Sequence, residues 1–353
     1  MNTHGAAADD PGRLRRRDLL AALDLGTNNC RLLVAEPSGD GGFRVTDSFS
    51  RIVRLGEGLG RTGVLADAAM ERALDALAVC AARLRRSGVG RVRAVATQAC
   101  RAAANGDFFI RRVADETGLT LEVIAPAEEA RLSVAGCRTL VAPGHDAALV
   151  LDVGGGSTEL SWLDLHRFGP DGRPKLAAWA SLPIGVVSLA ERHPEVEGRA
   201  SEAWAAMLAE ASAAVRGAGD PARLSGAFAA GRGQLIGTSG AVTSLAALHM
   251  RLPRYHRDQV DGAWVTDADC RAVTERLLAM TVAERGAEAC IGPQRADLIL
   301  AGAAILRAVL DAWPAPRVRV ADRGLREGLL LDMLEKAEPP RRPRRNAMAT
   351  AAA

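Results

Sequence analysis

The spacing of apolar residues divides the chain into two halves with a similar plan. In the first half, apolar runs on both sides of residues 24–29 predict a β-hairpin, and residues 43–55 predict a third strand. Apolar residues three and four apart between positions 65 and 84 predict an amphipathic helix that stops near Gly88. Alternating residues over 92–97 predict a further strand.

The same kind of pattern continues toward the middle of the chain. Asn105 is a favourable N-cap residue and predicts the start of a helix that ends near Gly118. Residues 119–124 predict a strand, and Pro126 suits the first turn of the next helix.

The second half repeats this plan. Residues 147–153 predict a strand, residues 158–163 predict its hairpin partner, and residues 182–187 predict a third strand. Hairpins followed by alternating helices and strands predict an α/β fold, with a mixed sheet covered by helices in each half. The remaining predicted elements are helices at 200–215, 268–278, 296–310 and 324–334 and strands at 234–237 and 318–320.

Two of the hairpin turns have nearly the same sequence. Residues 23–29 read LDLGTNN, and residues 151–159 read LDVGGGSTE. In each, a buried strand delivers one Asp to a turn of small residues, which places a ligand for a hard metal beside free backbone N–H groups. Three consecutive glycines lose much backbone entropy on folding, and close approach of the backbone to a ligand explains them. The pair of turns predicts two similar domains that face one phosphate-bearing ligand.

Simpler interpretations of these turns stay open. Gly and Asn are the usual residues of an ordinary hairpin turn, so the first turn alone is ambiguous. A third turn, at residues 238–240, leads from a strand into a helix, where it either holds a phosphate or acts only as an N-cap. The predicted phosphate-binding residues are Gly26, Thr27, Asn28 and Asn29, then Gly154, Gly155, Gly156 and Ser157, and finally Thr238, Ser239 and Gly240.

Composition excludes several other classes of protein. The 353 residues are 48% hydrophobic and 25% charged, which fits a globular protein of about two domains. Aromatic residues make up only 3%, so stacking on single-stranded nucleic acid is not expected as the main function. Six cysteines form no Cys-x-x-Cys pair, which predicts reduced and mostly buried thiols. No apolar stretch approaches the ~20 residues that span a bilayer, so we expect a cytoplasmic protein with no membrane partner.

Candidate catalytic groups lie near the ends of predicted elements. Glu128 and Glu129 fall in the first turn of a helix, where the helix dipole alone favours acidic residues and where a carboxylate could also deprotonate an attacking water. Arg101 is either a surface residue or a bidentate phosphate clamp. The six His show no metal-ligand spacing, and the sequence contains neither a Walker motif nor a Ser nucleophile elbow.

Together these motifs resemble those of the exopolyphosphatase and guanosine pentaphosphate phosphohydrolase (Ppx/GppA) family. They occur in the family's order and cover about residues 20–334. The segments that carry the resemblance are residues 22–34, 96–101, 128–132, 151–160, 237–240, 295–297 and 325–328.

The resemblance implies two RNase-H-like domains, of the actin, sugar-kinase and heat-shock chaperone ATPase type, with a central cleft between them. It places domain I at residues 19–125 plus 321–336 and domain II at residues 126–320. Composition predicts that the basic tail at residues 1–18 and the tail at residues 337–353 are disordered. The chain is similar to the short, two-domain form of the family.

The resemblance also implies the chemistry. With Mg²⁺ or another divalent cation, the family removes the terminal phosphate of inorganic polyphosphate or the γ-phosphate of guanosine pentaphosphate (pppGpp). By the family's motifs, Glu129 is the catalytic base and Arg101 grips the phosphate chain. Asp152 and Glu159 are required for catalysis through metal and water, and Asp24 lies where related folds organise Mg²⁺.

Exopolyphosphatase is the function that we favour from the sequence, with pppGpp phosphohydrolase as the alternative. A nucleotide-dependent kinase, or a non-catalytic sensor of polyphosphate or nucleotide, would use the same fold. Relatives are often dimers, so a homodimer is expected, without a specific nucleic-acid partner.

Overall fold

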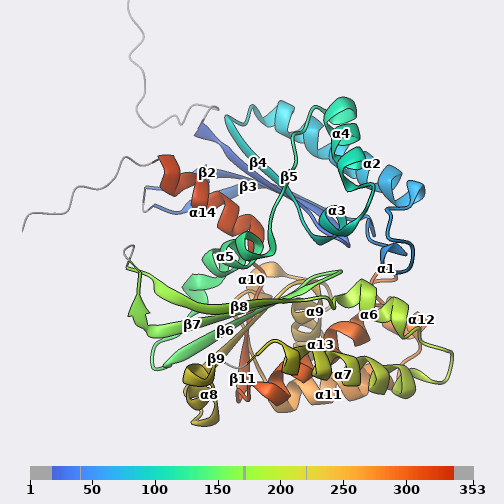
Figure 1. Cartoon of the computed structure of the whole chain (residues 1–353), viewed down its shortest axis with the longest axis vertical. Coiled ribbons are helices and arrows are strands. Elements are labelled where there is room, and N and C mark those ends of the chain that lie inside the picture. The colour runs from blue at the N-terminus through green and yellow to red at the C-terminus, as the bar shows by residue number, and fades with distance from the viewer. Residues whose placement is uncertain (1–17, 40, 170–171, 220, 338–353) are drawn as a thin grey trace, which may run out of the picture.

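The computed structural model describes residues 18–39, 41–169, 172–219 and 221–337. The two predicted disordered tails lie outside the described residues, except for their innermost positions. The described chain folds into two sheets, one above the other in Figure 1, each with helices packed against it. This arrangement confirms the α/β class and the plan of one sheet in each half.

The first sheet has the strand order β3-β2-β1-β4-β5. Strand β1 pairs antiparallel with β2 and parallel with β4, so the predicted hairpin lies beside the strand that follows the first long helix. The predicted strand at residues 119–124 is shorter than expected, because only two of its residues pair with β4. The strands are β1 (Leu20–Leu25), β2 (Asn29–Pro37), β3 (Phe43–Ile52), β4 (Arg91–Ala96) and β5 (Glu122–Val123).

The second sheet repeats this order and adds one strand, giving β8-β7-β6-β9-β11-β10. Here β6 pairs antiparallel with β7 and parallel with β9, as β1 does with β2 and β4. The near-repeat of sequence is therefore a repeat of topology. The strands are β6 (Ala147–Val153), β7 (Thr158–Phe168), β8 (Pro174–Leu182), β9 (Gly233–Thr238), β10 (Trp264–Thr266) and β11 (Arg317–Ala321).

The helices of the first half end where the sequence predicts. Gly88 and Gly118 follow helices α2 and α4 with φ of 64° and 73°, a left-handed conformation that glycine adopts without strain. Asn105 is the N-cap residue of α4, as predicted, but its side chain makes no capping hydrogen bond: its amide bonds the backbone N–H and C=O of Leu65 instead, at 2.8 and 3.0 Å. The helices are α1 (Leu59–Thr62), α2 (Asp67–Ser87), α3 (Gln98–Ala102) and α4 (Gly106–Thr117).

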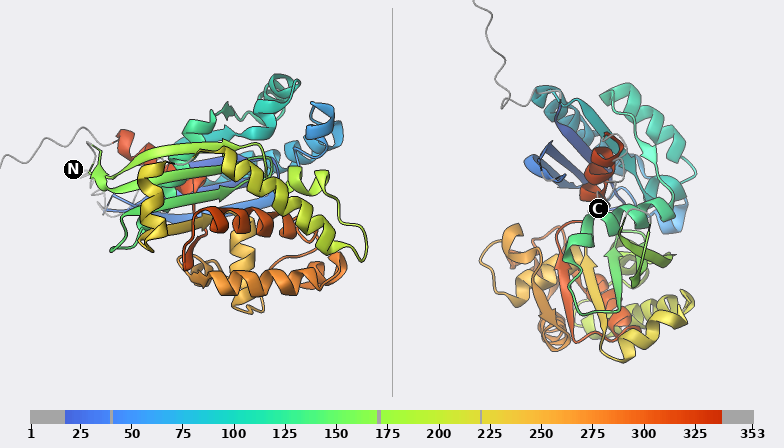
Figure 2. Two further views of the ribbon diagram at one scale, coloured as in Figure 1. Left: turned by 60° about the horizontal axis from the view of Figure 1, so that its bottom comes forward. Right: turned by 90° about the vertical axis from the view of Figure 1, so that its left-hand side faces the viewer.

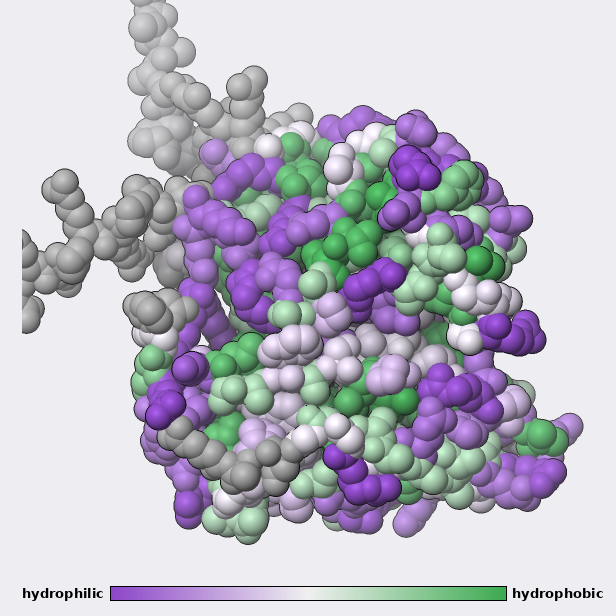
Figure 3. Space-filling model, viewed as in Figure 1, coloured by the Kyte–Doolittle hydropathy of each residue, from purple (hydrophilic) through white to green (hydrophobic). Residues whose placement is uncertain are grey.

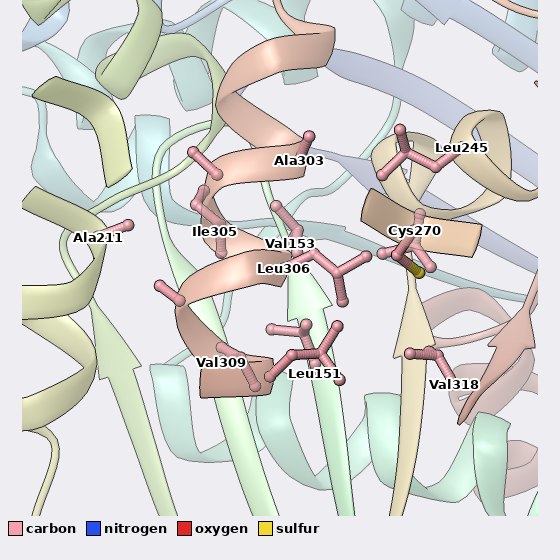
Figure 4. Packing of buried hydrophobic residues seen from close by; sticks show 14 of the residues in the cluster. Leu151, Val153, Ala211, Leu245, Cys270, Ala303, Ile305, Leu306, Val309 and Val318 are labelled. Carbon is pink, nitrogen blue, oxygen red and sulfur yellow. The ribbon is translucent and has the colours of Figure 1, made fainter. Parts of the chain in front are cut away.

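The helices of the second half cover one large apolar core. Figure 4 shows Leu306 and Val309 of α13 beside Leu151 of β6, in the cluster that fills this half. The predicted third strand at residues 182–187 is wrong, because β8 ends at Leu182 and the following apolar residues begin a helix. The helices are α6 (Val186–Arg192), α7 (Ala200–Gly217), α8 (Ala222–Ala229), α9 (Gly240–His249), α10 (Arg257–Val260), α11 (Asp267–Leu278), α12 (Val282–Ala287) and α13 (Ile299–Ala312).

Two helices lie between the sheets and join them. Helix α5 (Pro126–Cys137) and helix α14 (Leu325–Ala337) pack against each other, as Figures 1 and 2 show. Leu329 and Leu330 of α14 belong to the same buried cluster as Leu20 of β1, so the end of the chain covers a face of the first sheet. We propose on this basis that residues 321–336 belong with residues 19–125 as one domain.

Three features of the fold bear on what the composition predicts: the surface, the helices and the cysteines. On the face in Figure 3, hydrophilic and hydrophobic residues are intermixed. None of the described helices is both long and apolar enough to cross a bilayer. All six cysteines are unbridged and buried, as the sequence predicts.

Candidate active site

The two glycine-containing turns lie against each other in one cleft between the sheets. They close in the same way, since the Gly26 N–H donates to Asn29 O at 2.8 Å and the Gly154 N–H donates to Ser157 O at 2.9 Å. A Cβ atom on Gly155 would lie 2.9 Å from Cβ of Thr27. The predicted convergence of the two turns on one place is therefore present in the fold. We call them the first loop (residues 26–29) and the second loop (residues 154–157).

Two of the three glycines of the second loop, Gly155 and Gly156, have a further reason that the sequence does not suggest. A Cβ on Gly156 would lie 2.1 Å from Oε1 of Gln98, which belongs to the first half of the chain. A Cβ on Gly185 would lie 2.4 Å from the carbonyl carbon of Gly155. Gly155 and Gly156 must thus be small for contact between the halves, in addition to any approach of a ligand, and Gly185 must be small for contact with the second loop of its own half. Gly185 is not predicted as a site residue, because its closeness to the second loop arises only in the folded chain.

One cleft is lined by all of the predicted phosphate-binding residues and by the four predicted acidic residues. Asp24 and Asp152 come from corresponding positions of β1 and β6, each paired in its hairpin with the second residue after the loop, Arg31 and Glu159 respectively. Glu159 is the cross-strand partner of Asp152, and Glu129 enters from the first turn of α5. The fold thus brings together two strand ends, one hairpin partner and one helix N-terminus.

Glu129 and Glu159 are buried, Asp24 and Asp152 are half-buried, and each of the four carboxyl groups has a raised pKa. Burial raises the pKa of Asp24 to about 6, against the attraction of Arg31, and it also raises the pKa of Asp152. Burial and the charge of Asp152 raise the pKa of Glu159 to about 7. Burial and the charge of Glu159 raise the pKa of Glu129 to about 9. Repulsion within this group favours a bound cation when all four groups are ionised.

Neutral hydrogen bonds orient two of these acids. The hydroxyl of Ser133 on α5 donates to Asp152, and the hydroxyl of Ser181 on β8 donates to Glu159 Oε1 at 2.8 Å. Both bonds lower the pKa of their acceptors, in opposition to burial. No signal along the chain points to these two serines, because they come from elements distant from the loops.

Arg101 occupies a different position from the one that its predicted role requires. It does not line the cleft; its guanidinium donates to Ile124 O at 2.7 Å and to Glu129 Oε2 at 3.3 Å. It therefore pairs with the predicted catalytic base. Its role as a phosphate grip stays a prediction that requires this pair to open.

Three other arginines face the cleft with their guanidinium groups available. Arg31, Arg295 and Arg326 line it, and none of the three side chains forms a hydrogen bond or ion pair with another described residue. Arg31 and Arg295 both lie within 4 Å of the position that a Cβ on Gly240 would take. Each arginine belongs to a family-like segment, but the sequence alone assigns no role to any of them.

The third turn holds a residue in an unusual backbone conformation. Ser239 has φ 108° and ψ 170°, a region that is essentially restricted to glycine. Its Oγ accepts from Ala241 N at 3.3 Å, so it is the N-cap of α9, and its neighbour Thr238 donates to Arg323 O at 2.7 Å. The turn therefore caps a helix and also lines the cleft, so its predicted role in phosphate binding stays a prediction.

The donor set fits a hard divalent cation. Two buried amide oxygens, Oδ1 of Asn28 and Oδ1 of Asn29, have no hydrogen-bond partner among the described residues. They lie in the same cleft as the carboxyl groups of Asp24, Asp152 and Glu159, and Mg²⁺ prefers oxygen ligands of this kind. No group of three or more His, Cys, Asp or Glu within the described residues is already arranged around a common metal position. Cation binding therefore requires the carboxyl groups to move or to act through water.

Comparison with known proteins agrees with this geometry. The model of the Ppx/GppA phosphatase family matches residues 34–337. The chain belongs to the Ppx/GppA phosphatase family. It is therefore a hydrolase that acts on phosphoanhydride bonds, as the sequence predicts.

Individual Ppx/GppA members cover nearly the whole chain. Exopolyphosphatase 2 of Mycobacterium tuberculosis is 32% identical over 330 residues, with 89% of this chain and 98% of that protein covered. A guanosine-5'-triphosphate,3'-diphosphate pyrophosphatase of Photobacterium profundum is 29% identical over 330 residues, with 90% of this chain but only 60% of that protein covered. An exopolyphosphatase from Cytophaga hutchinsonii has a TM-score of 0.76 at 26% identity, with 91% of this chain and 99% of that chain covered.

Proposed function

We propose that this Ppx/GppA phosphatase is a Mg²⁺-dependent exopolyphosphatase that releases the terminal phosphate of inorganic polyphosphate. The observation that carries the proposal is the arrangement in one cleft of two backbone loops, three free guanidinium groups and a buried carboxyl group at a helix start. A linear polyanion needs its charge neutralised along several phosphates, and the loops and arginines lie together for that purpose. The 32% identical relative named exopolyphosphatase supports the same substrate.

Different groups of the cleft bind the phosphates and the cation. N–H groups of the first and second loops hold the terminal phosphoryl group, and Arg31, Arg295 and Arg326 neutralise the phosphates behind it. A cation held by Asp24, Asp152 and Glu159 would add positive charge at the reacting oxygens.

Glu129 acts on the attacking water. Its carboxylate orients a water molecule in line with the scissile bond and takes one proton as the oxygen bonds to phosphorus. The bridging P–O bond breaks, the shortened chain leaves with the bridging oxygen, and inorganic phosphate is the second product. A raised pKa makes the ionised Glu129 a stronger base than an ordinary glutamate, and the Arg101 pair holds the carboxylate in place.

The γ-phosphate of pppGpp is the second candidate substrate. The Photobacterium relative named as a pyrophosphatase of that nucleotide favours it, and the same loops and base would serve both reactions. The two substrates differ beyond their terminal phosphates, because pppGpp has a short phosphate chain joined to a nucleoside whereas polyphosphate is a long uniform polyanion.

A substrate panel tests the proposal. Phosphate release is measured from long-chain polyphosphate and from pppGpp, each with Mg²⁺ and with a chelator. Polyphosphate hydrolysis that requires Mg²⁺ supports the assignment, and hydrolysis of pppGpp alone replaces it with the second candidate. Glu128→Gln is the matched control for Glu129→Gln, since Glu128 is the preceding residue of α5 and pairs with Arg131 and Arg93 outside the cleft.

A further inference from the structure

A segment outside the cleft supports the first loop. In residues 53–58, which follow β3, the Val53 N–H donates to Asn28 O at 2.8 Å and the Gly56 N–H donates to Thr27 O at 2.9 Å. Gly56 also packs closely, since a Cβ there would lie 2.3 Å from Cγ2 of Thr27. The backbone position of the first loop is therefore tied to that of this segment.

The same segment reaches across to the second half of the chain. The Arg54 guanidinium donates through one nitrogen to Asp297 Oδ1 at 2.8 Å and to Gln294 O at 3.0 Å. The Gly58 N–H donates to Glu191 Oε1 at 2.9 Å. Two tethers thus connect residues 53–58 to elements that come after the first hairpin of the second sheet.

Glu191 leads directly to the second loop. It lies on α6, whose first N–H groups, from Val186 and Val187, donate to the carbonyls of Gly154 and Gly155 at 3.0 and 2.8 Å. The two loops are therefore connected through a series of hydrogen bonds. Residues 53–58 bond the first loop, α6 bonds residues 53–58 through Glu191, and α6 also bonds the second loop. The two loops then touch each other at Gly155.

The backbone of Arg54 is held by its neighbours in an uncommon conformation. Arg54 has φ 46°, which is uncommon for a residue with a side chain. Its N–H donates to Asn28 O, and Arg72 donates to the carbonyl of Val53 at 2.9 Å. Neither Arg54 nor Glu191 lines the cleft. Asp297 is part of the family-like segment 295–297, for which the proposed mechanism uses only Arg295.

We propose that Arg54 and Glu191 are positioning residues that hold the two loops in register across the cleft, and so set the affinity for the phosphate chain. The Arg54–Asp297 pair is half-exposed and the Glu191 contact is exposed, so each contributes modestly, and the two together bias the protein toward the arrangement in which both loops face one phosphoryl group. The expected change in KM rests on the proposed function, whereas the expected change in the arrangement of the two loops does not.

The kinetic test uses single and double substitutions. Arg54→Ala should raise KM for polyphosphate about three- to fivefold, and Arg54→Ala with Glu191→Ala about tenfold, with kcat changed less than about twofold. The control is Arg61→Ala on α1, since Arg61 is exposed and its side chain forms no hydrogen bond or ion pair with another described residue. A merely structural role would instead reduce the folded fraction, which lowers apparent kcat at unchanged KM.

Rescue variants separate the tethers from other effects. Glu191→Gln keeps an oxygen acceptor for the Gly58 N–H and should retain the wild-type KM. Arg54→Asp combined with Asp297→Arg reverses the charge pair and should return KM to within about twofold of wild type. An unchanged KM in Arg54→Ala with Glu191→Ala, or a charge reversal no better than Arg54→Asp alone, would overturn the proposal.

A second measurement does not depend on catalysis. Because all six native cysteines are buried, dyes can be attached selectively at Asp75→Cys on α2 and Glu275→Cys on α11, which are exposed positions in different halves. Energy transfer without substrate should report a longer or broader distance distribution in the Arg54→Ala, Glu191→Ala double variant and no change with Arg61→Ala. An unchanged distance distribution in the double variant would reject the proposed role of Arg54 and Glu191. A wild-type protein that hydrolyses neither substrate would reject only the proposed function, because the distance measurement does not depend on catalysis.

Discussion

Adding one methyl group at Gly185 should displace the second loop without replacing any residue of the proposed site. In Gly185→Ala the new Cβ would lie 2.4 Å from the carbonyl carbon of Gly155 and 2.5 Å from Gly156 N, whereas ordinary contacts are 3.4–4 Å. The obstacles are backbone atoms, so the loop itself must move by about 1 Å. The φ of Gly185 is −147°, which alanine adopts without strain, so the effect is steric.

A displacement of about 1 Å at a reacting group reduces turnover by about 10²-fold. We expect kcat/KM for phosphate release to fall by that factor and the free energy of unfolding to fall by about 1–3 kcal/mol. The control is Gly226→Ala in α8, where a Cβ meets nothing within 4 Å and helix propensity favours alanine. A folded Gly185→Ala protein, judged by circular dichroism, with kcat/KM within twofold of wild type would refute this account of the loop contact.

The same site supports three further predictions. Glu129→Gln should lower kcat by at least about 10²-fold while equilibrium binding of polyphosphate persists; near-normal turnover would exclude Glu129 as the base. Ser239→Gly should raise stability to urea by about 1 kcal/mol, because φ 108° is strained for serine but not for glycine, and a loss of stability would show that the N-cap bond outweighs the strain. In chelator the free energy of unfolding should fall as pH rises from 4.5 to 9, since burial raises the pKa of Glu129 from 4.5 to about 9 and the folded state therefore binds the proton more tightly. Added Mg²⁺ should offset that loss. Glu129→Gln should show a smaller decline than wild type, with the remaining decline due to the raised pKa values of Asp24, Asp152 and Glu159, and an equal decline in the two proteins would contradict the assignment to Glu129.

Local signals in the sequence are sufficient to predict the elements that place the loops. The hairpins around residues 24–29 and 151–159 are predictable because the apolar runs and the glycine turns agree, and the helix ends at Gly88 and Gly118 because only glycine adopts their φ easily. The strand predicted at residues 182–187 is wrong because a short apolar run fits either a strand or the start of a buried helix. Here the backbone carbonyls of the second loop accept hydrogen bonds from the first N–H groups of α6, which favours the helix.

Contacts between distant parts of the chain cannot be predicted in the same way. The Asn105 amide has the chemistry of a cap, but Leu65 offers it two backbone partners that only the fold brings near. The family resemblance implies that Arg101 grips the phosphate chain, and its pairing with Glu129 in the structure has no signal along the chain. Arg54 and Asp297 are 243 positions apart, and no pattern along the chain links them. The loops and acidic residues of the cleft are therefore predictable, but its arginines and its internal pairing are not.

Helix α14 has a consequence for the synthesis of the protein. The first sheet is complete in sequence once β5 has been made, yet Leu20 and Leu33 on one of its faces pack with Leu329 and Leu330, which are translated only after the whole second sheet. Until helix α14 leaves the ribosome, that apolar face lacks Leu325, Leu329, Leu330 and Met333 and is covered only by residues made earlier, such as Leu132 of α5. The first half of the nascent chain therefore stays incompletely packed until α14 has been made. A chain released before Leu325 would expose part of this face to chaperones and proteases.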